Sequence, residues 1–173
     1  MARAKARKSG TSPAGAEVSS DPLLRFYSMP GFLVRRSKQK STYMFMEHCG
    51  RFGITPIQYA VLKILEARPG SDQGEISDLT ALDAATTGGV IQRLHKRGLV
   101  QRVARGRHRV TFLTKAGARI LERVEPHVAE SQGAILNPLN EREQRQLLRL
   151  LSKVLGVTND HYRVPSARNR RRW

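Results

Sequence analysis

The central segment of the chain, residues 82–98, has the sequence LDAATTGGVIQRLHKRG. Asp83 can cap the start of a helix, and Gly98 can end it. The apolar side chains between them, at positions 90, 91 and 94, recur at the spacing of one buried helical face. The segment therefore predicts a helix whose opposite face carries small and polar residues.

Two further helices are predicted directly before this one. Residues 55–58, TPIQ, combine a capping residue, a proline at the first helical position and a glutamine at the third, and residues 68–71, RPGS, end the helix that they begin. Residues 72–75, DQGE, repeat the capping pattern for a short helix through Leu79. This short helix and the one that follows it predict a helix-turn-helix.

A β-hairpin is predicted after the helix-turn-helix. Residues 99–103 and 109–113 are short apolar or β-branched runs, and the residues between them, ARGRH, form a basic tip. Thr114 can then cap a long helix with a bend at Pro126, and Asn140 can cap a last helix with a broad apolar stripe. The fold class expected is mainly α-helical with a small β-hairpin wing, in which a winged helix-turn-helix domain joins a helical dimerisation region.

Composition sets the expected domain boundaries. Residues 1–22 form a basic tail and residues 158–173 an Arg-rich tail. Both are expected to be disordered, because burial of their few large apolar side chains cannot offset the conformational entropy lost on ordering. A long first helix is expected to begin near Gly31. The folded span, residues 23–157, then divides into dimerisation helices at 23–50 and 115–157 and a winged helix at 54–114.

The chain carries a net charge of +17, because 31 Lys and Arg side chains are opposed by 14 Asp and Glu. Residues 22–160 alone hold 22 basic and 12 acidic side chains, so the excess is not confined to the tails. Such an excess favours a polyanionic partner, bound through phosphate contacts that release counterions. Double-stranded DNA is the partner that suits a helix-turn-helix.

Several classes of protein are not expected. Cys49 is the only cysteine, which excludes an internal disulfide and is typical of a reducing cytosol. No secretory signal and no run of about 18 apolar residues occurs, so we expect a cytoplasmic protein with no membrane partner. The histidines lack metal-ligand spacing, and no phosphate-binding glycine loop or nucleophile motif occurs, so no metal, no cofactor and no enzymatic activity are expected. Two neighbouring carboxylates do not change this expectation. Glu122 and Glu125 are expected to form ion pairs with Arg119 and Arg123 of the same helix, rather than to act as a catalytic pair.

The helix of residues 83–97 has the composition of a DNA-reading helix. Small or hydrogen-bonding groups in its first turns would let the backbone approach the floor of the major groove. Two glycines inside a helix cost about 1 kcal/mol each relative to alanine, and we expect close approach to DNA, rather than packing, to be their reason. The candidate DNA-binding residues are Ala85, Thr86, Thr87, Gly88, Gly89, Gln92, Arg93 and Lys96, together with Arg105, Arg107 and Arg109 of the wing.

The order and spacing of these elements resemble the MarR family. The resemblance is carried by ITPIQY at 54–59, by residues 82–94 running into RGLV at 97–100, and by Leu113-Thr114 with Gly117. It implies an obligate homodimer in which the first and last helices interlock, while the winged domain of each subunit enters neighbouring major grooves. The wing departs from the family pattern, because it is shorter and lacks the usual Asp beside its Arg.

A candidate effector pocket also comes from this resemblance. Residues 30–36, PGFLVRR, resemble a subgroup that controls the breakdown of aromatic acids, some members of which respond to aryl-CoA thioesters. The family pocket is lined from the first, second and fifth helices, where Arg35 or Arg36 could pair with a carboxylate or a CoA phosphate. The walls would come from Phe32, Tyr43, Met46, His48 and Tyr59, each of which could instead be an ordinary core or surface residue.

The sequence thus predicts a sequence-specific DNA-binding transcriptional repressor that a small aromatic ligand releases from a palindromic operator. One alternative is an architectural protein that coats DNA with little sequence preference and has no effector. Another is a redox-sensing repressor, in which an imidazolium at His48 would lower the pKa of the Cys49 thiol and favour the reactive thiolate. A lone buried cysteine without such a role is the ordinary reading of the same residue.

Overall fold

The computed structural model describes residues 21–106 and 108–156. It contains two compact units, Met1–Lys38 and Gln39–Trp173, which are treated separately. The two tails expected to be disordered lie almost entirely outside the described residues. Across the described ranges, no helix is both long enough and apolar enough to cross a membrane.

The first unit contains α1 (Pro22–Tyr27) and the first turns of α2 (Pro30–Cys49). The Asp21 carboxylate caps α1 by accepting the Leu23 N–H at 2.8 Å. The Phe32 ring of α2 packs on the rings of Phe26 and Tyr27, with centroids 4.6 and 5.3 Å away. The expected start of a long helix near Gly31 is thus correct within one residue, and a separate short helix precedes it.

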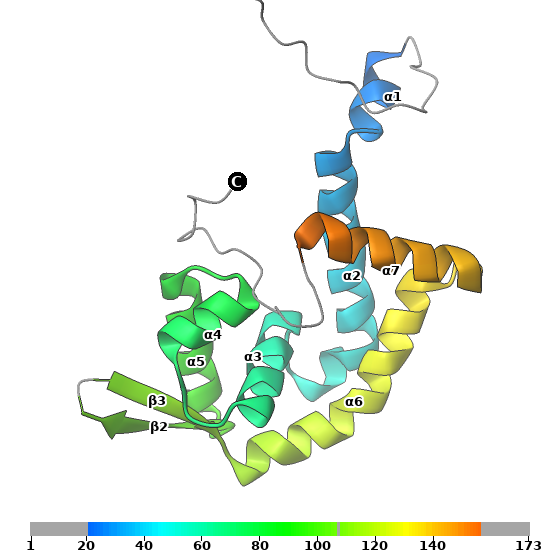
Figure 1. The fold of residues 1–173 in the computed structure, drawn as a ribbon. Coiled ribbons are helices and arrows are strands. Elements are labelled where there is room, and N and C mark those ends of the chain that lie inside the picture. Colours follow the sequence, from blue (N-terminus) through cyan, green and yellow to red (C-terminus); the bar gives the residue numbers. More distant parts are fainter. Residues whose placement is uncertain (1–20, 107, 157–173) are drawn as a thin grey trace, which may run out of the picture. The chain divides into compact units, whose positions relative to one another are not determined.

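The second unit holds a winged helix-turn-helix (Figure 1). After the short η1 (Gly50–Phe52) come three helices, and a hairpin follows them. The fold class expected from the sequence is confirmed. The elements are α3 (Pro56–Ala67), β1 (Ser71–Asp72), α4 (Gln73–Thr80), α5 (Ala84–Lys96), β2 (Val100–Arg105) and β3 (His108–Leu113).

The sheet has three antiparallel strands in the order β1-β3-β2. In the hairpin, Val100 lies opposite Leu113 and Arg105 opposite His108, so both strands extend further toward the tip than the sequence predicts. Strand β1 was not expected. It consists of two residues whose partners in β3 lie far along the chain, which leaves no local pattern to find.

The helix starts follow the predicted caps. Thr55 and Gln58 form a complete capping box on α3, and Asn140 and Glu143 form another on α7 (Glu141–Leu155). Thr114 caps α6 (Lys115–Leu136), which continues as one helix through Pro126. These caps are local signals, which is why the sequence alone locates them well.

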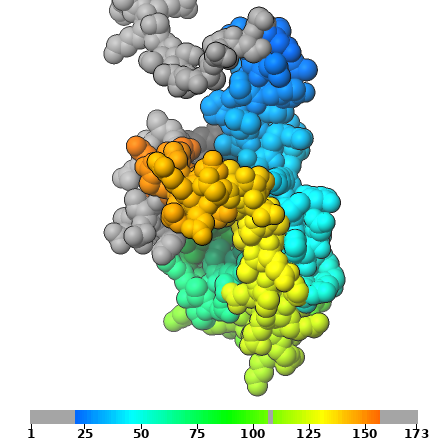
Figure 2. Space-filling model, turned by 90° about the vertical axis from the view of Figure 1, so that its right-hand side faces the viewer, coloured from blue at the N-terminus to red at the C-terminus, as the bar shows by residue number. Residues whose placement is uncertain are grey.

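The core of the second unit lies around α3, which packs on α4, α5 and α6, while α5 and α6 also contact the hairpin. Its largest members are fully buried aliphatic side chains, as the amphipathic spacing of each helix requires. They are Ile54, Val61, Leu62, Leu65, Ile76, Val90, Ile91, Leu94, Val100, Leu121 and Val124. In contrast, α7 has no buried residue, and Figure 2 shows it, in orange, on the surface beyond the yellow end of α6.

The start of α6 packs against the start of the hairpin at Gly117. A Cβ atom at this position would lie 2.2 Å from the carbonyl oxygen of Leu99 and 2.7 Å from the Cδ1 of Leu113. Backbone cannot yield as a side-chain tip can, so only glycine fits. This contact sets the distance between α6 and the winged helix-turn-helix.

We therefore predict that Gly117→Ala lowers the free energy of unfolding by about 1–3 kcal/mol, the usual cost of overpacking. Gly133→Ala on the same helix is the control, because a Cβ there meets nothing within 4 Å and alanine favours the helix. Chemical denaturation of both variants measures the difference. Equal stability of the two variants would contradict the assigned role of Gly117.

Candidate nucleic-acid interface and effector pocket

The N-terminus of α5 is fixed by Asp83. Its carboxylate accepts the Thr86 N–H at 2.8 Å and the Thr86 hydroxyl at 2.7 Å. These two hydrogen bonds hold the pKa of Asp83 below its usual value, and the bond from the Thr86 N–H has the larger effect. The first turn of the helix is therefore capped by an ionised carboxylate at neutral pH.

One side of α5 is exposed in its first turn and again from Gln92 to Lys96, with a partly exposed Gly89 between them. Val90, Ile91 and Leu94 are buried, and the opposite side carries polar and basic groups. Arginine and glutamine there have the donors and acceptors that read base edges, and lysine and arginine bind phosphates. The exposed candidates on this helix are Ala85, Thr86, Gln92, Arg93 and Lys96.

Thr87 does not belong to this surface. Its side chain is 0% exposed, and its hydroxyl donates to the backbone carbonyl of Asp83 at 2.9 Å. The prediction that Thr87 contacts DNA is therefore wrong for its side chain. The helical period explains the error, because Thr87 precedes Val90 and Ile91 by three and four residues and so shares their buried face.

Gly88 faces the neighbouring helix. A Cβ there would lie 3.0 Å from Nε2 of Gln73 on α4, and that same Nε2 donates to the carbonyl oxygen of Ala84 at 2.8 Å. Close packing of α4 on α5, rather than approach to DNA, accounts for Gly88. At Gly89 an added Cβ would meet only the Arg93 side chain, at 3.4 Å. Gln73, which the sequence pattern did not single out, thus positions the first turn of α5.

The wing presents its arginines on two sides. Arg105 lies opposite His108, and Arg109 lies opposite Ala104. Because paired residues share a face and neighbours alternate, Arg105 and Arg109 point to opposite faces of the hairpin. Both are exposed. Arg107, the third wing candidate, lies outside the described residues.

Arg97 closes the far end of α5. Its Nη1 donates to the carbonyl oxygen of Gly53 at 2.5 Å, and Gly53 adopts a left-handed conformation with φ of 66° directly after η1. Arg97 is therefore a clamp between the end of α5 and the loop that precedes α3. No short-range pattern in the sequence indicates this contact.

The effector candidates divide between the two units. In the first unit, Phe32 is half-buried in the aromatic cluster described above, while Arg35 and Arg36 are exposed on α2. In the second unit, Tyr43 and Met46 are exposed.

The other two effector candidates are engaged with neighbours. His48 Nδ1 lies 3.6 Å from the Glu130 carboxylate. Tyr59 packs on Phe45 with ring centroids 5.8 Å apart, and burial is the main cause that raises its pKa.

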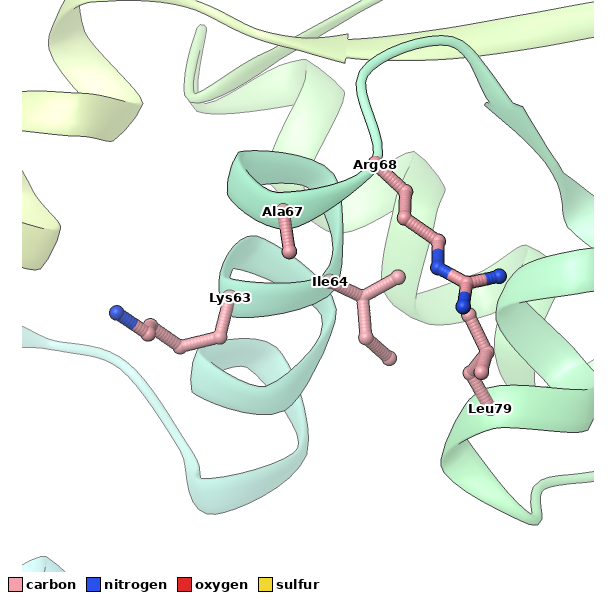
Figure 3. A pocket seen from close by; sticks show the side chains of 5 residues that line it. All are labelled: Lys63, Ile64, Ala67, Arg68 and Leu79. Atoms are coloured by element: carbon pink, nitrogen blue, oxygen red, sulfur yellow. The ribbon is translucent and has the colours of Figure 1, made fainter. Parts of the chain in front are cut away.

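Two hollows of the second unit are lined by other residues. Figure 3 shows one of about 460 Å³ between α3 and α4, lined by Lys63, Ile64, Ala67, Arg68 and Leu79. Its cations are neutralised, because Lys63 contacts Glu66 at 2.6 Å and Glu125 at 3.0 Å, and Arg68 contacts Glu75 at 3.1 Å. The hydrogen bonds from Lys63 to Glu66 and Glu125 raise the pKa of Lys63, and the bond to Glu66 has the larger effect. Glu125 thus pairs with Lys63 on α3, and not with an arginine of its own helix as expected.

A second hollow, of about 490 Å³, is lined by Arg51, Phe52, Arg123 and His127. We call it the η1 hollow. Its residues come from η1 and from the middle of α6. The sequence analysis named none of the four as ligand-binding residues.

Cys49 is fully buried. Burial raises the pKa of its thiol, the charge of Glu130 raises it further, and only Arg51 opposes them. The effect of His48 proposed for the redox-sensing alternative is not found, since His48 faces Glu130 instead. Within residues 21–106 and 108–156, no group of three or more His, Cys, Asp or Glu side chains is placed to hold a metal ion.

Comparison with known proteins agrees with this arrangement. A family model described as the MarR family matches residues 52–109. The HTH-type transcriptional repressor NicR of Pseudomonas putida is 30% identical over 148 residues, which cover 84% of this chain and 93% of that protein.

Solved structures match over most of their length. The PcaV transcriptional regulator from Streptomyces coelicolor, in complex with its natural ligand, is 30% identical in sequence and has a TM-score of 0.70. The match covers 99% of that chain and 84% of this one. The structure of BpsR from Bordetella bronchiseptica, which concerns the regulation of its DNA binding by 6-hydroxynicotinic acid, is 28% identical in sequence and has a TM-score of 0.71. The match covers 95% of that chain and 75% of this one. By its sequence and by its fold, the chain belongs to the MarR family of winged helix-turn-helix transcriptional regulators.

Proposed function

We propose that this protein is a homodimeric repressor that binds a palindromic operator and leaves it when a small aromatic acid, or its CoA thioester, binds. The observation that carries the DNA-binding part is the exposed polar and basic side of α5, held at one end by Asp83 and at the other by Arg97. A helix fixed at both ends can enter the major groove without a further loss of conformational entropy.

The candidate contacts have different tasks. Gln92 and Arg93 can read base edges, since their side chains offer the paired hydrogen bonds that distinguish one base pair from another. Lys96 lies near the end of α5, where it suits a phosphate. At the wing, whichever of Arg105 and Arg109 faces the DNA can enter the minor groove.

A second copy of the chain is the proposed partner of α7. Leu148, Leu150, Leu151, Val154 and Leu155 are between 41% and 71% exposed on this helix. Contiguous apolar surface of this kind marks an interaction site. A second copy offers the same stripe, and two-fold symmetry would place two α5 helices on the two halves of a palindrome.

The relatives support the proposed effector class. The printed description of BpsR names 6-hydroxynicotinic acid, a heteroaromatic carboxylic acid, as the regulator of its DNA binding. In this chain the exposed guanidiniums of Arg35 and Arg36, in the first unit, are the proposed partners of such a carboxylate. The proposed apolar and aromatic contacts are Phe32 of the same unit and Tyr43, Met46, His48 and Tyr59 of the second unit. The ligand releases DNA only if it prefers the geometry that does not fit the operator.

The deciding experiment measures binding to the intergenic DNA upstream of the gene, with random DNA as competitor, at about 150 mM salt. We expect specific binding that an aromatic acid or its CoA thioester abolishes. Arg93→Gln should weaken operator binding about tenfold or more, whereas Arg142→Gln, the same charge change on α7, should not. Equal competition by random DNA and no active compound would favour the architectural alternative, which the net charge of +17 supports.

The dimer has a separate test. We expect Leu151→Glu to shift the protein to monomers in sedimentation experiments, because a carboxylate would have to be buried in the α7 interface. Gln146→Glu on the same helix adds the same charge at an exposed polar position and should leave the dimer intact. Dimers that persist in Leu151→Glu would exclude α7 as the interface.

The redox alternative also makes a measurable claim. We expect the thiol of Cys49 to react slowly with a thiol reagent in the folded protein and quickly in denaturant, since it is buried and its pKa is raised. Cys49 is the only cysteine, so the signal has one source. Release of DNA by peroxide that disappears in Cys49→Ser would instead support the redox-sensing repressor.

A further inference from the structure

The η1 hollow contains a chain of directed hydrogen bonds. Nη2 of Arg51 lies 2.6 Å from Nε2 of His127, and Nδ1 of His127 lies 3.0 Å from the Glu130 carboxylate. A guanidinium can only donate, so Nε2 accepts and the proton of the ring is on Nδ1, from which it is donated to Glu130. Glu130 is thereby occupied with His127, and also with His48 at 3.6 Å.

Two guanidiniums meet at one aromatic ring in this hollow. The Cζ of Arg51 lies 5.1 Å, and that of Arg123 5.7 Å, from the centroid of the Phe52 ring. Phe52 packs against the hydrophobic core, and the His127 ring lies 5.2 Å from it. The ring therefore lies beside both cations, which line the same hollow.

Among the described residues, neither guanidinium of the hollow has a direct carboxylate partner, and Glu130 is linked to Arg51 only through His127. Among the described residues, the structure gives Arg51 one hydrogen bond, to a neutral imidazole, and gives Arg123 neither a hydrogen bond nor an ion pair. Contact with one ring leaves most donors of the two guanidiniums unsatisfied. The cations of the hollow between α3 and α4, by comparison, are all paired with carboxylates.

We propose that the η1 hollow binds a small oxyanion, a carboxylate or phosphate group held by Arg51 and Arg123 over Phe52. The guanidinium fork matches the oxygen pair of such groups, and the anion would relieve the repulsion between the two cations. The volume of about 490 Å³ exceeds that of the charged group alone and leaves room for a small organic acid. None of the four lining residues belongs to the set proposed for the effector, although Glu130 contacts both His127 of the hollow and His48 of that set.

The same site is connected to the recognition helix. Gly53 follows Phe52 directly, and its carbonyl oxygen accepts the hydrogen bond from Arg97, the residue that ends α5. A shift of Arg51 and Phe52 around a bound anion would move this acceptor. Occupancy of the hollow therefore changes the affinity for DNA, and DNA changes the affinity for the anion by the same factor.

Histidine NMR signals test the site directly. The full chain is titrated with inorganic phosphate and, separately, with benzoate, while chloride keeps the ionic strength constant. We expect a saturable shift of the His127 signal, which is identified by its loss in His127→Gln. In Arg123→Gln the apparent dissociation constant should rise about tenfold or more, since a charge-assisted contact is lost, whereas Arg119→Gln on the same helix should behave as wild type.

A response to phosphate alone assigns the site to phosphate groups, a response to benzoate alone assigns it to carboxylates, and either supports the proposal. No saturable shift with either probe overturns it. So does an equal shift in Arg123→Gln.

The connection to α5 is tested by operator binding with and without phosphate, or benzoate if only benzoate binds. We expect a change of affinity in wild type that Arg123→Gln removes, while release by the aromatic effector persists in that variant. An unchanged affinity at saturating anion overturns the connection. Loss of the effector response in wild type would instead overturn the proposed function and leave the oxyanion site standing.

Discussion

The burial of one face of α5 is the constraint on which the rest of the structure depends. Val90, Ile91 and Leu94 are at most 2% exposed, and removing each such side chain from water contributes about 1.5–3 kcal/mol. Because the three lie on one stripe, the helix cannot turn about its axis without exposing them. The orientation of Gln92 and Arg93 toward solvent is thus a direct result of how the core packs.

Local signals in the sequence were enough for most of the fold. Each cap from Thr55 to Asn140 depends on residues within one turn of the helix that it starts, and each was predicted. What could not be predicted depends on contacts between distant segments. Strand β1 exists only because Ser71 and Asp72 pair with Thr111 and Val110.

The candidate sites show the same division. The exposed side of α5 follows from helical spacing, and the same spacing, applied more strictly, would have placed Thr87 inside. The packing of Gly88 on Gln73 and the pairing of Lys63 with Glu125 require knowing how helices lie against one another. The η1 hollow is a still clearer case, since Arg51 and Arg123 belong to segments with no shared pattern.

The clamp at the end of α5 has a consequence for how such a protein can change over generations. Arg97 binds a backbone carbonyl, that of Gly53, and every amino acid supplies a carbonyl. Most side chains around the loop can therefore change without releasing the helix, provided that the loop keeps its path, which at Gly53 includes a φ of 66° that favours glycine. Position 97 is the more constrained end of the contact, because a shorter or uncharged side chain there would lose the hydrogen bond to the Gly53 carbonyl oxygen.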